Sequence, residues 1–304
     1  MVTGRFAPSP SGRMHLGNIF SGLLAWLSVR SADGEIVLRM EDLDPERTNE
    51  YFAALIREDL RWLGLDWDRE GTRQRLRADA YNAAMERLQA QGLLFPCWCT
   101  RGDLKAASAP HAADGKPIYP GTCRSLSAIE RARKQKPPLW RILAPDREIA
   151  FEDGLQGVYR ENLATECGDF VLRRADGVHA YQLAVVVDDA AMGVNQVVRG
   201  RDLLDSTPRQ IYLQQCLGYP TPAYFHVPLL LAPDGRRLSK RERDLDMGAL
   251  RTRYRPEALL GHLACLAGIL EYDESVSAEE LIHEFSWKKV RREDICISSE
   301  YQKQ

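Results

Sequence analysis

Apolar residues in the first third of the chain form short extended runs that alternate with runs at helical spacing. Between Glu50 and Leu63, apolar residues recur three and four positions apart, which is typical of an amphipathic helix. The expected elements are a strand over Thr3–Ala7, a helix over Leu16–Arg30, a strand over Glu35–Met40 and a helix over Glu50–Leu63. Strands that alternate with helices predict an α/β fold with a parallel sheet and crossover helices.

This alternation is interrupted and then returns. Residues 96–159 are rich in Pro, Gly, Cys and short polar runs, which indicates an insertion with a small structure of its own. Beyond it we expect strands over Leu183–Val187 and Gln196–Arg199, a helix over Ser206–Leu217 between an N-cap at Ser206 and a stop at Gly218, an apolar segment over Phe225–Leu231, and mostly helices from Met247, including Pro256–Ile269. The expected domains are 1–95 and 166–243 as the two halves of the sheet domain, 96–165 as the insertion, and 244–304 as a small helical domain.

The composition is that of an ordinary globular protein, with 44% hydrophobic and 28% charged residues. The chain has no long apolar run that predicts a membrane span and no signal-peptide layout, so we expect a cytoplasmic protein with no membrane partner. The seven cysteines are an odd number and do not indicate a disulfide framework.

The net charge is −2 and the pI about 6.3, so nucleic-acid binding would depend on local basic patches. Such patches can also be ordinary solvated surface. The candidates are Arg236, Arg237, Lys240, Arg241 and Arg243; Arg251, Arg253 and Arg255; and Lys288, Lys289, Arg291 and Arg292.

The first predicted strand leads into the helix through the stretch RFAPSPSGRMHLGN, residues 5–18. A glycine-containing turn between a strand and a helix is where an α/β fold binds phosphate, because backbone N–H groups and the helix dipole favour anions there. Gly17 lacks a Cβ, so a flat ring such as adenine can approach the backbone, and His15 can donate to phosphate. By itself this pattern would equally fit a tight turn with a surface histidine.

A second segment favours the phosphate site over the simple turn. Lys240 beside Ser239 follows a glycine-containing loop, and a mobile lysine there would neutralise phosphates during transfer at an α-phosphate. Together, Pro8–Gly12 with His15–Asn18 and Leu238–Lys240 resemble the paired signatures of class I aminoacyl-tRNA synthetases. The runs Arg5–Gly12, Leu38–Asp44, Val187–Asp189 and Val198–Gly200 are similar, in the same order, to the glutamyl-tRNA synthetase family.

The resemblance implies a Rossmann-type parallel-sheet catalytic domain and an adjoining pair of sites. The implied glutamate site contains Arg5, Ala7, Ser9, Glu41, Tyr181 and Arg199. The implied ATP site contains Pro8, His15, Gly17, Asn18, Arg237, Leu238, Ser239, Lys240 and Arg241, with Mg²⁺ on the nucleotide and with His15 and Lys240 as the catalytic residues. Arginine forks suit the two carboxylates of L-glutamate, and Glu41 suits its ammonium. The chain departs from the usual second signature at Arg237 and Arg241, where the family has Lys and Ser.

Three cysteines of the expected insertion, Cys97, Cys99 and Cys123, suggest a zinc site, for which zinc needs a fourth ligand. From chemistry alone His111 is the orthodox candidate. The resemblance to the short members of the family, with Cys-x-Cys and then Tyr-x-x-x-Cys, implies Tyr119 instead. We favour Tyr119 and a structural zinc; the alternative is three unligated thiols in a loop.

After Lys240 only 64 residues remain (304 − 240), too few for the large anticodon-reading region of a full glutamyl-tRNA synthetase. The resemblance to the short paralogues implies that ATP activates glutamate without tRNA. It further implies transfer of the glutamyl group to the cyclopentene-diol of queuosine at the wobble position of tRNA(Asp), by a monomer. The alternatives are an ordinary synthetase that charges the tRNA 3′ end, a non-catalytic RNA-binding protein of synthetase type, and a ligase that joins glutamate to another small acceptor.

Overall fold

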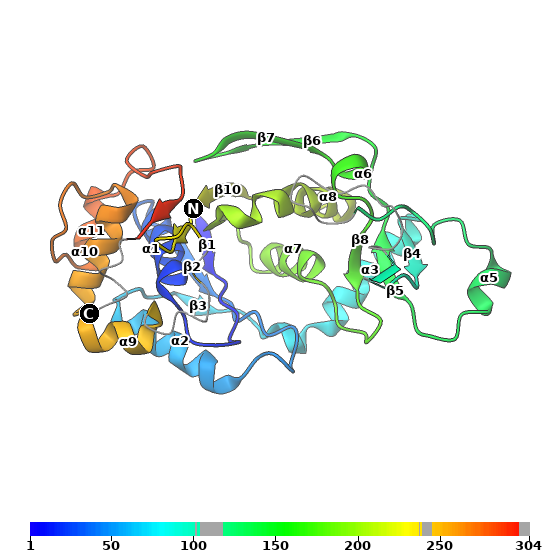
Figure 1. Ribbon diagram of the computed structural model, residues 1–304, viewed down its shortest axis with the longest axis horizontal. Helices are drawn as coiled ribbons and strands as arrows, with labels where there is room; N and C mark the ends of the chain where they lie inside the picture. The colour runs from blue at the N-terminus through cyan, green and yellow to red at the C-terminus, as the bar shows by residue number, and fades with distance from the viewer. Residues whose placement is uncertain (101, 104–117, 237, 239–244, 298–304) are drawn as a thin grey trace.

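The structure is a computed structural model that describes residues 1–100, 102–103, 118–236, 238 and 245–297 (Figure 1). The N-terminal part contains β1 (Thr3–Phe6), α1 (Leu16–Arg30), β2 (Glu35–Leu38), α2 (Glu50–Trp62), β3 (Arg69–Glu70) and α3 (Ala78–Ala90). The strands form a parallel sheet in the order β1-β2-β3, with Thr3 opposite Glu35. The strands and helices predicted for this part of the chain are therefore confirmed to within two residues at their ends.

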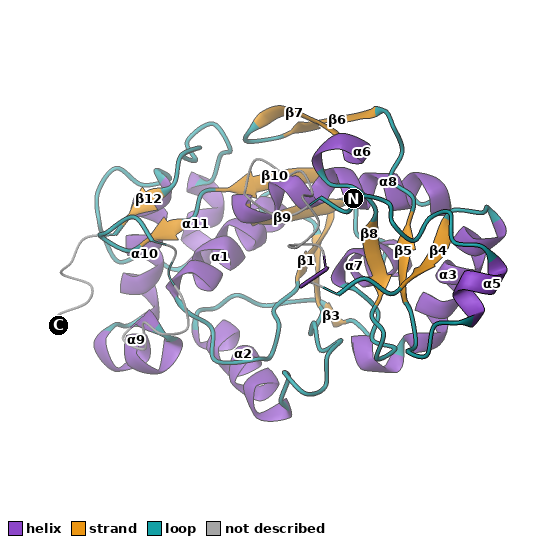
Figure 2. Cartoon of the chain, turned by 45° about the vertical axis from the view of Figure 1, so that its right-hand side comes forward, coloured by secondary structure: helices purple, strands orange, loops and turns teal. Residues whose placement is uncertain are grey.

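The middle of the chain forms two further sheets. It contains β4 (Leu94–Cys97), α5 (Ala128–Ala132), β5 (Leu139–Ile142), β6 (Glu148–Asp153), β7 (Gly157–Asn162), α6 (Leu163–Glu166) and β8 (Phe170–Arg173). Strands β4, β5 and β8 pair antiparallel at one end of the molecule, beside α3 and α5 (Figures 1 and 2). The β6–β7 hairpin extends a sheet of order β7-β6-β10-β9, in which β10 is Ala223–Val227 and β9 is Gln196–Gly200.

The α/β rhythm returns with α7 (Tyr181–Ala191), β9 (Gln196–Gly200), the 3-10 turn η2 (Arg201–Ser206), α8 (Thr207–Leu217), β10 (Ala223–Val227) and β11 (Leu230–Leu231). The predicted strand over Leu183–Val187 is wrong, because these residues lie in α7. Every residue from Leu183 to Asp189 is buried, so the run has no polar face, and a short apolar run does not distinguish a buried helix from a buried strand.

The sequence predicted that α8 begins after an N-cap at Ser206 and ends at Gly218. Gly218 ends α8 in the left-handed conformation at φ 64°, as expected. Ser206 lies before the first residue, but its side chain makes no capping hydrogen bond. Its backbone already has the right-handed helical conformation, because the turn η2 leads directly into α8, so the capping role predicted for Ser206 is wrong.

The last described segment contains α9 (Met247–Arg253), α10 (Pro256–Ala267), α11 (Ala278–Glu284) and β12 (Ile295–Cys296), which pairs with β11. Buried residues of α10 and α11, such as Leu263 and Leu281, belong to the same hydrophobic cluster as Phe20 and Leu24 of α1. These helices gather at the end of the molecule opposite β4 and β5 (Figures 1 and 2). Among the described helices, none combines the length and apolarity needed to cross a membrane.

Candidate active site

A cleft of about 530 Å³ opens where β1, β2 and β9 end, at the carboxyl edge of the parallel strands. Ligands of α/β proteins bind at this edge because the loops that follow the strands meet there. The residues predicted from the sequence that line the cleft are Arg5, Ala7, Pro8, His15, Gly17, Asn18, Glu41, Tyr181, Arg199 and Leu238. Segments more than 190 residues apart in the chain thus contribute to one site.

The turn between β1 and α1 supplies one wall. His15 occupies the N-cap position of α1, and its backbone N–H donates to Asn18 Oδ1 over 3.1 Å. A Cβ at Gly17 would lie 3.2 Å from His15 Cε1, closer than ordinary van der Waals contact. Glycine at this position therefore lets the His15 ring lie against the backbone at the start of a 15-residue helix, whose dipole favours anions.

Arg5 enters the cleft from β1 with only 6% of its surface exposed. Its Nη1 donates to the Val198 carbonyl over 3.0 Å, and its Nε lies 3.8 Å from Asp189 Oδ1 without a hydrogen bond. Burial lowers the pKa of Arg5, and Asp189 opposes that shift. Among the described residues, both N–H groups of Nη2 are uncommitted, so a carboxylate can accept from this guanidinium and relieve its desolvation.

A buried ion network lies behind Arg5. Arg39 is fully buried, and its guanidinium donates to Asp189 through Nη1 and to Glu41 Oε1 over 3.2 Å. Burial alone would lower the pKa of Arg39, but the two carboxylates reverse the direction and raise it. Burial raises the pKa of Glu41, although Arg39 opposes this. An ammonium group bound beside Glu41 would stabilise its ionised form.

Arg199 of β9 is held on several sides. Its Nε donates to His226 Nε2 over 3.0 Å and its Nη1 to Gln210 Oε1 over 2.8 Å. Its Nη2 donates to Thr207 Oγ1 over 2.7 Å and to the Leu203 carbonyl over 3.4 Å. These contacts use four of its five N–H groups, so within the described part of the chain one Nη1–H is uncommitted where Arg199 lines the cleft.

Tyr181, the first residue of α7, completes the predicted glutamate site, and burial raises its pKa. Ser9 is not brought into the cleft: it is exposed, and its Oγ lies 3.4 Å from Ser11 Oγ. Leu238 lines the cleft, whereas the remaining residues predicted around it, Arg237, Ser239, Lys240 and Arg241, lie outside the described residues.

The residues that follow the second signature segment contact the first signature segment. Asp246 forms an antiparallel bridge with His15, and the Met247 N–H donates to the Met14 carbonyl over 2.9 Å. Behind this contact, the buried Asp59 accepts from both Arg13 and Arg251 over 3.0 Å. Arg251 also pairs with Glu58, so this member of a predicted basic patch is used inside the fold.

Several cleft residues were missed at the level of the sequence. Gly200, Asp202 and Leu203 line the cleft directly after β9, and Ser21 and Gly22 line it from α1. Asp202 comes soon after Arg199, a predicted glutamate-binding residue, so its place in the sequence could have indicated that it lines the cleft. Arg39 and Asp189 belong to the runs that resemble the glutamyl-tRNA synthetase family. Their pairing joins positions 150 residues apart, so no local sequence pattern could predict it.

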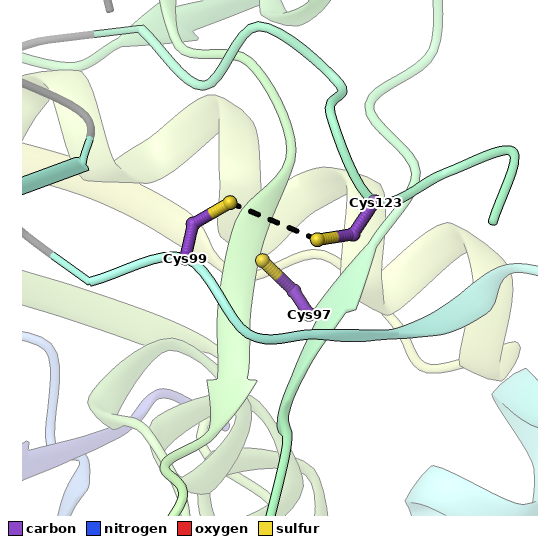
Figure 3. A group of neighbouring side chains, drawn as sticks. All are labelled: Cys97, Cys99 and Cys123. Atoms are coloured by element: carbon purple, nitrogen blue, oxygen red, sulfur yellow. Dashed lines mark hydrogen bonds between the residues drawn. The ribbon is translucent and has the colours of Figure 1, made fainter. Parts of the chain in front are cut away.

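The three predicted cysteines meet in the small antiparallel part of the structure (Figure 3). Their Sγ atoms all lie within 4.8 Å of one another, and Cys99 Sγ is 3.7 Å from Cys123 Sγ. Tyr119 Oη lies 3.5 Å from Cys97 Sγ and accepts from the Cys123 N–H over 2.6 Å. The structure therefore places the four predicted side chains next to one another; His111 lies outside the described residues.

These distances fit tetrahedral zinc. Zn–S bonds of about 2.3 Å at tetrahedral angles place two sulfurs about 3.8 Å apart, and a Zn–O bond of about 2.0 Å places oxygen about 3.5 Å from sulfur. The observed separations are 3.7 Å for Cys99–Cys123 and 3.5 Å for Cys97–Tyr119. The Arg141 guanidinium lies 4.1 Å from the Tyr119 ring centroid, and its Nε donates to Cys97 Sγ over 3.4 Å. Its positive charge offsets the excess negative charge that three thiolates and a phenolate would carry around Zn²⁺.

Comparison with known proteins places the whole chain in one family. The family of class I tRNA synthetases (E and Q), catalytic domain, matches residues 1–301. A protein of Symbiobacterium thermophilum named glutamyl-Q tRNA(Asp) synthetase is 50% identical, over 99% of this chain and 97% of its own. A protein of the same name from Nitratidesulfovibrio vulgaris is also 50% identical, over 89% of this chain and 87% of its own.

Solved structures give the same result. A glutamate tRNA ligase from Elizabethkingia meningosepticum, in complex with its amino acid, superposes with a TM-score of 0.84 and 28% identity. The match covers 99% of this chain and 68% of that one. The glutamate–tRNA synthetase of Elizabethkingia anophelis gives a TM-score of 0.85 at the same identity, over 99% of this chain and 69% of that one. The predicted α/β fold with a parallel sheet is thereby confirmed.

Proposed function

This chain belongs to the class I tRNA synthetases of the E and Q type, and on that premise we propose that it activates L-glutamate with ATP, without tRNA, and transfers the glutamyl group to tRNA(Asp). The observation that carries the proposal is that two arginines, Glu41 and the turn at the start of α1 line one cleft. One cleft thus offers groups for both carboxylates and the ammonium of glutamate beside a place for phosphate.

The charges of the cleft match the amino acid. Among the described residues, the two N–H groups of Arg5 Nη2 and one N–H of Arg199 Nη1 have no acceptor, and we assign them to substrate carboxylates and Glu41 to the ammonium. Tyr181 and Ala7 line the same cleft. Because each buried charge then gains a partner, glutamate binding relieves desolvation on both sides.

The proposed reaction needs no covalent enzyme intermediate. A carboxylate oxygen of glutamate attacks the α-phosphorus of ATP in line, an acyl–O–P bond forms, and the bond to the β-phosphate breaks as pyrophosphate leaves. Pro8, His15, Gly17, Asn18 and Leu238 line the nucleotide end of the cleft. Lys240, with Arg237, Ser239 and Arg241, would stabilise the charge that develops on the phosphates. Mg²⁺ bound to ATP would neutralise the leaving pyrophosphate.

We assign the cluster of Cys97, Cys99, Tyr119 and Cys123 to one structural zinc ion, on the distances given above. A bound Zn²⁺ would crosslink β4 to the segment that contains Tyr119 and Cys123. The hydrophobic cluster there consists of few residues, so a metal ion would add stability to this part of the fold. The positive charge of Arg141 would offset the negative charge of the ligands.

The acceptor in the proposal is the cyclopentene-diol of queuosine at the wobble position of tRNA(Asp), which rests on the resemblance and on the names of the relatives. An unstacked loop base can be presented to an open cleft. The alternative is an ordinary glutamyl-tRNA synthetase, whose fold superposes on this chain but which the names of the relatives do not favour. We expect the protein to act in the cytoplasm as a monomer.

One experiment separates these functions. Glutamate-dependent ATP–pyrophosphate exchange is measured with and without tRNA, followed by transfer of labelled glutamate to tRNA(Asp) with and without queuosine. Exchange without tRNA, with label only on the queuosine-containing tRNA, supports the proposal. Exchange only with tRNA(Glu), with label on its 3′ end, supports the ordinary synthetase. Absence of exchange in folded, zinc-replete protein would refute both enzymatic functions and leave RNA binding.

A further inference from the structure

A histidine that none of the proposed steps uses lies directly behind Arg199. His226 of β10 is completely buried and contacts Arg199 on one side and Asp153 on the other. Asp153, the last residue of β6, is also buried. The three side chains come from three neighbouring strands of the sheet β7-β6-β10-β9, so they form a line from the interior to the cleft.

The hydrogen bonds of this line determine which ring nitrogen carries the proton. A guanidinium only donates, so His226 Nε2, 3.0 Å from Arg199 Nε, must accept and carries no hydrogen. A neutral ring then has its hydrogen on Nδ1, which lies 2.6 Å from Asp153 Oδ2 and donates to it. The ring is thus the Nδ1–H tautomer, held from both sides.

The titration behaviour of the pair agrees with this assignment. Burial lowers the pKa of His226, although Asp153 opposes the shift, and the positive Arg199 adds to it. Burial alone would raise the pKa of Asp153, but the hydrogen bonds from His226 and from the Gln156 backbone hold it below its usual range. A carboxylate beside a neutral ring is therefore the state near neutral pH.

We propose that Asp153 and His226 are positioning residues, which fix the Arg199 guanidinium in the orientation that presents its uncommitted N–H to a substrate carboxylate. The inference rests on the proposed glutamate site. Gln210 and Thr207 hold the Nη atoms, but the only described contact of Nε is with His226. Loss of the acceptor on His226 would leave Nε without its described hydrogen bond and let the guanidinium tilt about its remaining bonds to Gln210 and Thr207, and the cost would appear in glutamate binding rather than in the chemical step.

Two amide substitutions separate positioning from simple packing. The amide of His226→Gln falls near the place of Nε2 and offers Arg199 an oxygen acceptor. The amide of His226→Asn falls near Nδ1 and contacts Asp153 only. Both remove the ring, so both alter packing alike. Matched controls are His262→Gln and His262→Asn, because His262 is also buried and bonded to a carboxylate, Asp273, over 2.8 Å, but lies in α10 away from the cleft.

The readout is the KM for glutamate against kcat in ATP–pyrophosphate exchange. His226→Asn is expected to raise this KM about tenfold or more, the effect of one hydrogen bond to a charged group, while kcat and the KM for ATP change less than about twofold. His226→Gln is expected to keep the KM within about threefold of the unaltered protein, and neither His262 variant should move it. An equal rise for both His226 variants, or a loss confined to kcat, would overturn the inference.

If the proposed function is wrong, the unaltered protein itself will show no exchange. That result differs from an effect of the His226 variants, and it would also refute the inference. A second measurement needs no folded variant at position 226. His262 Nδ1 also faces a carboxylate, Asp273, so the probe is nitrogen NMR of histidine-labelled His262→Gln protein near neutral pH, which should still show a ring with hydrogen on Nδ1 and none on Nε2. All rings as Nε2–H, or a charged His226 ring, would overturn the assignment whether or not the variants fold.

Discussion

Replacement of Arg5 by methionine tests the proposed glutamate site at a buried guanidinium. Methionine fills much of the same space without charge, and Asp189 keeps Arg39 as its ion-pair partner. The Val198 carbonyl loses the bond from Arg5 Nη1, so the free energy of unfolding should fall by about 1–3 kcal/mol. The protein should therefore remain folded at room temperature.

The effect on binding follows from the donors that the structure leaves uncommitted. Both N–H groups of Arg5 Nη2 can form charge-assisted hydrogen bonds with one carboxylate, and each such bond contributes about 1.5–3 kcal/mol. Even the lower value for each bond gives a total of about 3 kcal/mol, which corresponds to a KM for glutamate about a hundredfold higher. The KM for ATP should not change, because we assign Arg5 to the amino acid and not to the nucleotide.

The assay is glutamate-dependent ATP–pyrophosphate exchange over a wide range of glutamate, with the melting temperature measured in parallel. The matched control is Arg57→Met, because Arg57 also makes two bonds to a carboxylate, Glu70, over 2.8 and 2.7 Å, but outside the cleft. If Arg5→Met lowered the melting temperature and left the KM for glutamate within about twofold of normal, Arg5 would be structural and its assignment to the substrate would be wrong.

The other predictions concern zinc, the chemical step and pH. Cys123→Ser should lose bound zinc, measured by metal analysis of purified protein, and undiminished zinc would refute the four-ligand site. Lys240→Ala should lower the single-turnover rate of glutamate activation more than ATP affinity, and an unchanged rate would remove Lys240 from that role. Burial raises the pKa of Glu161 to about 7 from 4.5, so the folded state binds its proton more tightly and stability falls as pH rises through that window. Glu161→Gln should thus stabilise the protein by up to about 3 kcal/mol at pH 8 and much less at pH 5, measured by denaturant unfolding; an equal gain at both pH values would show that Glu161 does not titrate there.

The sequence by itself determined the features that depend on neighbours along the chain. The strand–turn–helix at residues 3–30 follows from Pro8, the glycines of the turn and a long apolar helix, and it places His15 and Gly17 at a helix start. Gly218 ends α8 because only a residue without Cβ adopts the left-handed conformation freely. The order of the motifs also indicated the family, and residue type and spacing indicated the three cysteines of the cluster. Only the resemblance to the family pointed to Tyr119.

Only the tertiary structure decided which side chains share a site and what holds them there. The run Leu183–Val187 lies in a helix that is buried on all sides, so its sequence has no amphipathic pattern and did not show whether it is a helix or a strand. Arg39 meets Asp189 across 150 residues, and Asp153 meets His226 across 73. Whether a buried charge is tolerated depends on partners that the fold brings close, since desolvation is a property of the assembled interior. The sequence indicated that Arg199 binds the substrate. Only the fold showed that, among the described residues, its hydrogen bonds to other side chains leave few N–H donors for that substrate.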